Sequence, residues 1–193
     1  MKHLFLILAL LLSNISFSQI NSNIRNNILD THESQVLHLF NSINEYRESN
    51  GLNPLELDTG LVNACEMHCI YMSFYDCAGH YQRRQDSIHL MKNISFFRDR
   101  AVHYKGKIGP WLAENSCNLY FTYEQPWGKG IKYDLNNLTY VDYSFNVLGA
   151  WKWSKYHNKT LLNPKGKSAG VYQYVYIDKS GKPRVASTFL ITN

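Results

Sequence analysis

The C-terminal part of the sequence constrains the fold most, because it carries a complete β-hairpin pattern. Residues 170–178 read GVYQYVYID and residues 184–192 read RVASTFLIT, two runs rich in β-branched and aromatic side chains. The segment between them, KSGKP at 179–183, supplies turn residues. Runs of this kind on either side of a glycine-containing turn are typical of paired antiparallel strands. The sequence therefore predicts a terminal hairpin.

Helical patterns precede this hairpin. In residues 34–49, apolar side chains recur three and four positions apart, and Asn50-Gly51 supplies a stop. A second helix is expected to begin with Asp58 as its N-cap, and a third to run from about Tyr143 to Tyr156. The stripe expected to be buried on the second helix consists of Leu61, Cys65 (or Ala64), His68, Cys69 and Met72. Helices first and a hairpin last indicate an α+β fold.

The N-terminus is typical of a secretory signal peptide. Residues 2–3 are Lys and His, and residues 4–12 form a continuous apolar run. The small residues Ser16 and Ser18 occupy the positions expected before a cleavage site. We therefore expect cleavage after Ser18 and an exported protein.

The rest of the chain suits one domain. We expect residues 1–18 to be the signal peptide, 19–33 a polar leader and 34–193 the folded domain, within the roughly 100–200 residues of a single domain. At 45% hydrophobic residues the chain can bury a core. No other stretch has the roughly 18 uninterrupted apolar residues of a membrane span. The expected location is secreted or periplasmic, with no transmembrane span.

The net charge of +5 is unevenly distributed. A run that contains only two acidic residues, Asp86 and Asp99, carries seven basic ones: Arg83, Arg84, Lys92, Arg98, Arg100, Lys105 and Lys107. Such a run can attract nucleic acid or an anionic envelope surface. No basic–aromatic recognition motif accompanies it, so a solvated loop is the preferred interpretation and a nucleic-acid partner is not expected.

Four cysteines in an exported chain point first to disulfides. They are Cys65, Cys69, Cys77 and Cys117, and four cysteines permit three pairings. Metal binding by Cys65 and Cys69 is the weaker interpretation, because an oxidising compartment favours disulfides.

Three polar residues lie in otherwise apolar settings. His80 follows the second predicted helix in CAGHY, Glu114 lies in WLAENSC, and His157 lies in WKWSKYHNKTLLNP. An ionisable group on a largely apolar segment is costly unless it is paired. Taken singly, each has an ordinary explanation: a turn residue, an exposed carboxylate, or a cation at a helix end.

Together these segments resemble the CAP superfamily, the SCP-like extracellular domain of cysteine-rich secretory proteins, antigen 5 allergens and pathogenesis-related proteins, here in its bacterial branch. The resemblance runs in order from residue 34 to the C-terminus and is carried best by NEYRESNGLNPLELD and WSKYHNKTLLNP. It implies a three-layer α-β-α sandwich with a small antiparallel sheet. It also implies that His80, Glu114 and His157 share one cleft. Ser154 is expected at the same cleft, at the position where animal members often carry a second glutamate.

The resemblance favours a binding module over an enzyme. Family members are credited with binding lipids, sterols or metals and with occasional proteolysis, so the expected partner is an unidentified small ligand, lipid or protein. A divalent metal such as zinc is the candidate cofactor, with His80 and His157 as ligands and Glu114 as a ligand or as the group that orients one. The alternative is a hydrolase that uses a metal-bound water or a Glu114–histidine pair as general base.

The expected cleft also suggests a disulfide. Cys77 and Cys117 each lie three residues from a cleft member, so we expect a Cys77–Cys117 bond joining the cleft walls. Cys65 and Cys69 lie i,i+4 on one helix, where a bridge is geometrically awkward, so buried thiols and a strained bond both remain open for them.

Overall fold

The computed structural model describes residues 32–82, 94–122, 126, 132 and 138–193. The signal peptide and most of the polar leader lie outside these residues, as do Arg83, Arg84 and Lys92. The helices are α2 (His32–Ser49), α3 (Thr59–Tyr75), α4 (Phe97–His103), α5 (Tyr140–Trp153) and α6 (Lys155–Leu161). The strands are β1 (Glu56–Leu57), β2 (Leu112–Tyr120), β3 (Ser168–Ile177) and β4 (Pro183–Thr192). Of these helices, none is long and apolar enough to cross a membrane.

The strands form one sheet in the order β1-β3-β4-β2. The predicted hairpin is confirmed, since β3 and β4 pair antiparallel from Ser168 opposite Thr192 to Ile177 opposite Pro183. Strand β2 joins the free edge of β4, also antiparallel. The sheet is not wholly antiparallel, however, because the short β1 pairs parallel with β3. This strand lies in the segment LNPLELD, where a two-residue strand leaves no periodic signal.

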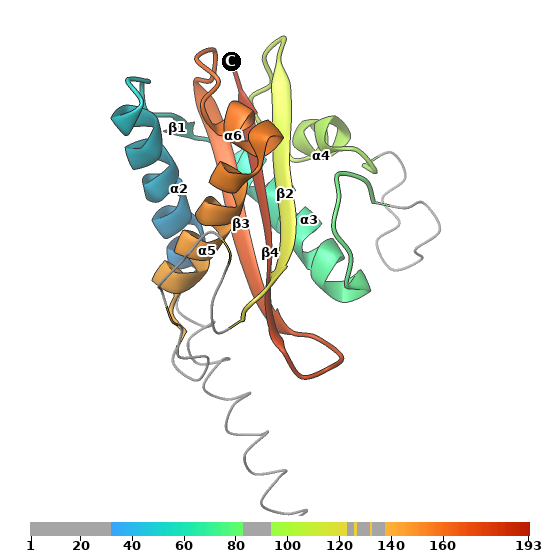
Figure 1. Cartoon of the computed structure of the whole chain (residues 1–193). Coiled ribbons are helices and arrows are strands. Elements are labelled where there is room, and N and C mark those ends of the chain that lie inside the picture. The colour runs from blue at the N-terminus through green and yellow to red at the C-terminus, as the bar shows by residue number, and fades with distance from the viewer. Residues whose placement is uncertain (1–31, 83–93, 123–125, 127–131, 133–137) are drawn as a thin grey trace, which may run out of the picture.

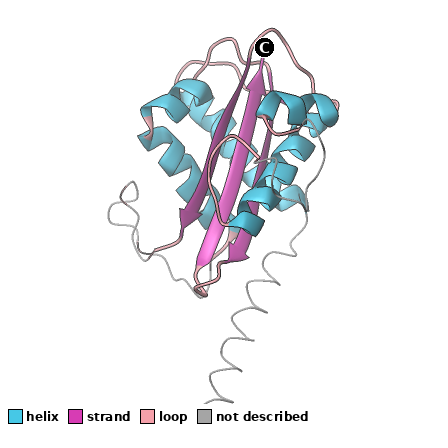
Figure 2. Ribbon diagram, turned by 90° about the vertical axis from the view of Figure 1, so that its right-hand side faces the viewer, coloured by secondary structure: helices cyan, strands magenta, loops and turns pink. Residues whose placement is uncertain are grey.

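Helices cover both faces of the sheet, which confirms the predicted α-β-α sandwich (Figures 1 and 2). Neighbouring residues of β4 show the two faces. The hydroxyl of Thr188 contacts the thiol of Cys69 on α3, whereas the ring of Phe189 packs against Trp151 on α5, with ring centroids 6.1 Å apart. Successive strand residues point to opposite faces. Helix α3 therefore covers one face, and α5 covers the other together with α2.

Helix α2 ends, and helix α3 begins, where the sequence predicts. Helix α2 stops at Ser49, and Gly51 follows with φ of +74°, a conformation that glycine adopts without strain. Asp58 caps α3, since its Oδ1 accepts a hydrogen bond from the Leu61 amide at 2.8 Å. All the residues of the predicted α3 stripe are buried. The N-terminal half of the domain therefore follows local sequence signals closely.

The expected single helix over Tyr143–Tyr156 is in fact two. Ser154 takes an extended conformation, ends α5 and caps α6 through its side chain. Trp151 is fully buried and anchors α5 in the core, whereas Trp153 is 68% exposed.

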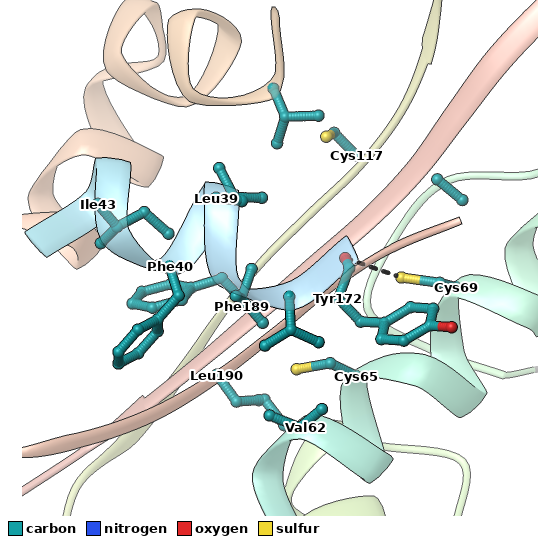
Figure 3. Close-up of a cluster of buried hydrophobic side chains, with 14 of the residues drawn as sticks. Leu39, Phe40, Ile43, Val62, Cys65, Cys69, Cys117, Tyr172, Phe189 and Leu190 are labelled. Carbon is teal, nitrogen blue, oxygen red and sulfur yellow. Dashed lines mark hydrogen bonds between the residues drawn. The ribbon is translucent and has the colours of Figure 1, made fainter. Parts of the chain in front are cut away.

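The predicted Cys77–Cys117 disulfide is not formed, and all four cysteines are free thiols. The reason is the pleat of β2. Asn118 points to the α3 face, where its amide donates to the Cys77 carbonyl at 2.8 Å, so the preceding Cys117 points to the opposite face. Figure 3 shows Cys117 apart from Cys65 and Cys69 of α3. Burial raises the pKa of the Cys117 thiol to about 12.

The remaining two cysteines are buried thiols, one of the two states left open for them. Cys65 donates a hydrogen bond to the Gly170 carbonyl of β3 at 3.3 Å. Cys69 donates one to the Tyr172 carbonyl at 3.4 Å, which Figure 3 shows as a dashed line. Burial raises the pKa of both thiols well above the usual value. They are therefore packing groups, and the structure gives no support to a metal site on them.

Candidate functional site

The candidate site is built on strand β2, whose adjacent residues Glu114 and Asn115 point to opposite faces of the sheet. Glu114 faces the α3–α4 layer, and its side chain is fully excluded from solvent. Asn115 faces the other layer, where its Nδ2 donates to the His157 carbonyl at 3.0 Å. Because successive residues of a strand point to opposite faces, this one dipeptide contacts groups on both sides of the sheet.

His80 lies directly over Glu114. Its Nδ1 is 2.9 Å from Glu114 Oε1. An ionised carboxylate only accepts hydrogen bonds, so Nδ1 carries the proton in this contact. In the neutral ring, Nε2 is then left with a free lone pair. The His80 side chain is 41% exposed, so this lone pair is within reach of a ligand.

Two polar contacts to the Gly79 carbonyl hold the loop that carries His80. The Gly79 carbonyl accepts a hydrogen bond from Ser116 Oγ at 3.0 Å and contacts His68 Nε2 at 2.7 Å. Gly79 has φ of +132°, which side-chain-bearing residues rarely adopt. His68 is buried, and its pKa falls to about 4, first because of burial and then because of the nearby charge of Arg100. The neutral, buried His68 thus helps to hold the loop that carries the partly exposed His80.

Arg100 completes the buried part of the site. Its guanidinium donates to Glu114 Oε2, and its NH1 donates to the carbonyls of His80 and Ser95, each at 3.3 Å. Both side chains of the Arg100–Glu114 pair are fully excluded from solvent. The interpretation of the basic run as a solvated loop is therefore wrong for Arg100, although Arg98, Lys105 and Lys107 are exposed.

His157 approaches from α6. Ser154 caps this helix by accepting from the His157 amide at 3.5 Å, so the relation between these two residues is a backbone cap and does not involve the imidazole. The His157 side chain is half-buried. Its pKa is lowered by burial and, second, by the nearby positive charge that His80 would carry. The structure thus places the two histidines close enough to interact electrostatically, with Glu114 under His80.

Helix α6 is held in place by a residue that the sequence analysis did not single out. Arg47, on α2, is 1% exposed and donates from NH1 to the Leu161 and Asn163 carbonyls, at 2.6 and 3.1 Å. These carbonyls lie at and just beyond the C-terminus of α6. Next to Arg47, the Tyr46 hydroxyl donates to Asn158 Oδ1 at 3.0 Å. The two best-matched motifs, NEYRES and WSKYHNKTLLNP, are therefore in direct contact.

The donor groups limit the kind of metal site that the cleft could form. Within the described ranges, no three His, Cys, Asp or Glu side chains form a metal-binding group. Each Glu114 oxygen accepts a hydrogen bond, one from His80 and one from Arg100, so this carboxylate is placed to orient His80. The cleft supplies two imidazoles, and a carboxylate orients one of them. These residues do not fit a site with three protein ligands.

Comparison with known proteins agrees with this architecture. The model of the cysteine-rich secretory protein family, CAP, matches residues 40–182. The chain belongs to this family. The match covers β2, the α5–α6 pair and both histidines, so the CAP resemblance of the sequence is confirmed over the whole candidate site.

Two solved structures show the same CAP fold. An outer surface protein from Borrelia burgdorferi has a TM-score of 0.55 and 18% identity, covering 86% of this chain and 96% of its own. An extracellular protein containing an SCP domain from Bacillus anthracis has a TM-score of 0.54 and 18% identity, over 82% of this chain and 40% of its own. At this identity the similarity shows the fold alone. Comparison with curated proteins finds no significant match.

Proposed function

We propose that this CAP protein acts outside the cytoplasm as a binding module, and that His80 and His157 together bind a divalent transition metal. The contact between His80 Nδ1 and Glu114 Oε1 carries the proposal. A metal-binding histidine commonly donates its other ring N–H to a carboxylate, which fixes the ring and its tautomer. In this protein the contact with Glu114 holds the His80 ring in one orientation.

The protonation state of the second histidine supports the same proposal. Metal binding requires neutral imidazole. The lowered pKa of His157 favours the neutral ring at pH 7. Two imidazoles leave coordination positions for water or for a small exogenous ligand. The N-terminal signal-peptide pattern and the extracellular and outer-surface relatives support a location outside the cytoplasm.

The geometry supports binding better than hydrolysis. A catalytic zinc site usually has three protein ligands and one water, whereas the described residues supply two imidazoles. Glu114 is also poorly placed as a general base, because both carboxylate oxygens accept hydrogen bonds from His80 and Arg100. The Ser154 hydroxyl caps α6 and has no base beside it in the described contacts.

The test is a calorimetric titration of untagged protein with zinc at pH 7.5. We expect one equivalent to bind, and His157→Ala to lower the affinity at least tenfold. His103→Ala is the matched control, because His103 is an exposed histidine on α4 and should leave the affinity unchanged. Equal affinities in the wild type and in His157→Ala would overturn the proposal.

A further inference from the structure

A second surface lies where α5 meets α6, and the proposed metal site does not use it. It consists of two exposed aromatic residues and five exposed lysines, which we call the α5–α6 surface: Trp153, Tyr156, Lys152, Lys155, Lys159, Lys165 and Lys167. The lysines of residues 165 and 167 lie on the connection from α6 to β3. Figure 1 shows α5 and α6 together on the outside of the sandwich.

The aromatic residues of this surface are largely exposed to solvent. Trp153 is 68% exposed and Tyr156 is 81% exposed, and only Ser154 and Lys155 separate them. Phe145, two helical turns before Lys152 on α5, is 46% exposed. Leaving large rings in water forgoes the free energy of burying them. Grouped exposure of this kind marks an interaction surface.

The charge of the surface has one sign. Between Asp142 and Asp178 the chain contains no acidic residue, and all five of its lysines are exposed. One of them is also held in place, because the Lys152 ammonium lies 4.3 Å from the centroid of the Tyr46 ring. An anionic partner would therefore complement the charge of these residues.

We propose that the α5–α6 surface docks onto an anionic lipid bilayer. Tryptophan and tyrosine are the residues that favour the boundary between water and lipid, because their rings are apolar and carry one polar group. Lysines beside them are attracted to anionic headgroups. Binding to a membrane surface strengthens with buried apolar area and with attraction to anionic lipids, and these residues supply both.

The basic residues of this surface are lysines and not arginines. This favours a bilayer over a polyanion whose phosphates are recognised individually. The segment from Asp142 to Asp178 contains no arginine. Arginine forms the bidentate contacts that recognise individual phosphates, whereas lysine acts as a point charge. Diffuse attraction to many headgroups needs only point charges.

The experiment is co-sedimentation of the purified protein with vesicles. Vesicles of phosphatidylcholine alone are compared with vesicles that contain phosphatidylglycerol. We expect binding only to the anionic vesicles. Lys155→Gln/Lys159→Gln should weaken it by about tenfold or more, since each lysine near an anionic surface contributes roughly a fivefold factor. Trp153→Ser should also weaken it.

Two control variants remove the same kinds of side chain from parts of the protein outside the α5–α6 surface. Lys179→Gln/Lys182→Gln removes the same charge from the β3–β4 turn, and Phe74→Ser removes a 51% exposed ring from α3. Both should bind as the wild type does. No binding to anionic vesicles, or equal losses in the control variants, would overturn the proposal. Tight binding to soluble dextran sulfate that depends on the lysines but not on Trp153 would overturn it in favour of a polyanion partner.

Discussion

The guanidinium of Arg100 and the carboxylate of Glu114 form an ion pair from which solvent is fully excluded. His80 rests on the same carboxylate, so the pair forms the floor of the candidate site. Removing one member of a buried pair leaves an uncompensated charge, which typically costs about 3–5 kcal/mol.

Arg100→Met should therefore lower the free energy of unfolding by about 3–5 kcal/mol, because Glu114 would lose its charged partner. Denaturant unfolding at pH 7.5 measures it. Arg98→Met is the control, since Arg98 is exposed two residues away and should change stability by less than about 0.5 kcal/mol. A similar small effect at both positions would show that the pair does not support the fold.

How far the sequence predicts this structure depends on whether the signals are local. The hairpin, the Asp58 cap and the stop at Gly51 follow from neighbouring residues, and all three were predicted. Strand β2 was not predicted, because Glu114, Asn115 and Ser116 are three consecutive polar residues that place polar side chains on both of its faces. The alternation of apolar and polar residues that identifies a half-buried strand is therefore missing.

Other features depend on tertiary contacts that the sequence does not display. The break between α5 and α6 falls at Ser154 without a glycine or proline, so nothing local marked it. Arg100 lies in a charged run, and only its partner Glu114 distinguishes it from exposed neighbours. The candidate site is predicted only by the family resemblance, because the motif match is what groups His80, Glu114 and His157.

Stability should depend on pH through His68. Its pKa is about 4 in the folded protein and about 6.5 when unfolded, so the unfolded chain binds the proton more readily. The contribution of the neutral ring is complete above pH 6.5 and is lost as the pH falls toward 4. Arg100, Glu114 and His80 are the charged or titratable groups that influence it.

Between pH 7.5 and 4.5 the wild type should therefore lose about 2–3 kcal/mol more stability than His68→Gln does. Unfolding at a series of pH values measures this difference. His103→Gln, a change to an exposed histidine, should follow the wild-type curve. Parallel curves for the wild type and His68→Gln would mean that His68 titrates normally in the folded protein.

The four cysteines should behave as thiols. The intact mass should show no loss of hydrogen to disulfides, and a reducing agent should leave the melting temperature unchanged. In the native protein only the half-buried Cys77 should react with a thiol reagent at an appreciable rate, whereas all four should react after unfolding. A melting temperature that falls on reduction would contradict the free-thiol structure.

Arg47 should control the position of α6. Arg47→Ala should cost about 3 kcal/mol, because it leaves buried carbonyls at the end of α6 without their donor. Tyr46→Phe removes one hydrogen bond nearby and should cost about 0.5–1.5 kcal/mol. Thermal or denaturant unfolding ranks the two variants. Equal costs would show that Arg47 is not the main anchor of α6.

The most direct test of the central claim records the imidazole nitrogen signals of each histidine by NMR while zinc is added at pH 7.5. The His80 and His157 signals should change together and saturate at one equivalent, while those of the exposed His38 and His103 should stay fixed. Zinc-induced changes confined to other histidines, or to only one of the pair, would contradict the claim that His80 and His157 form a single binding site.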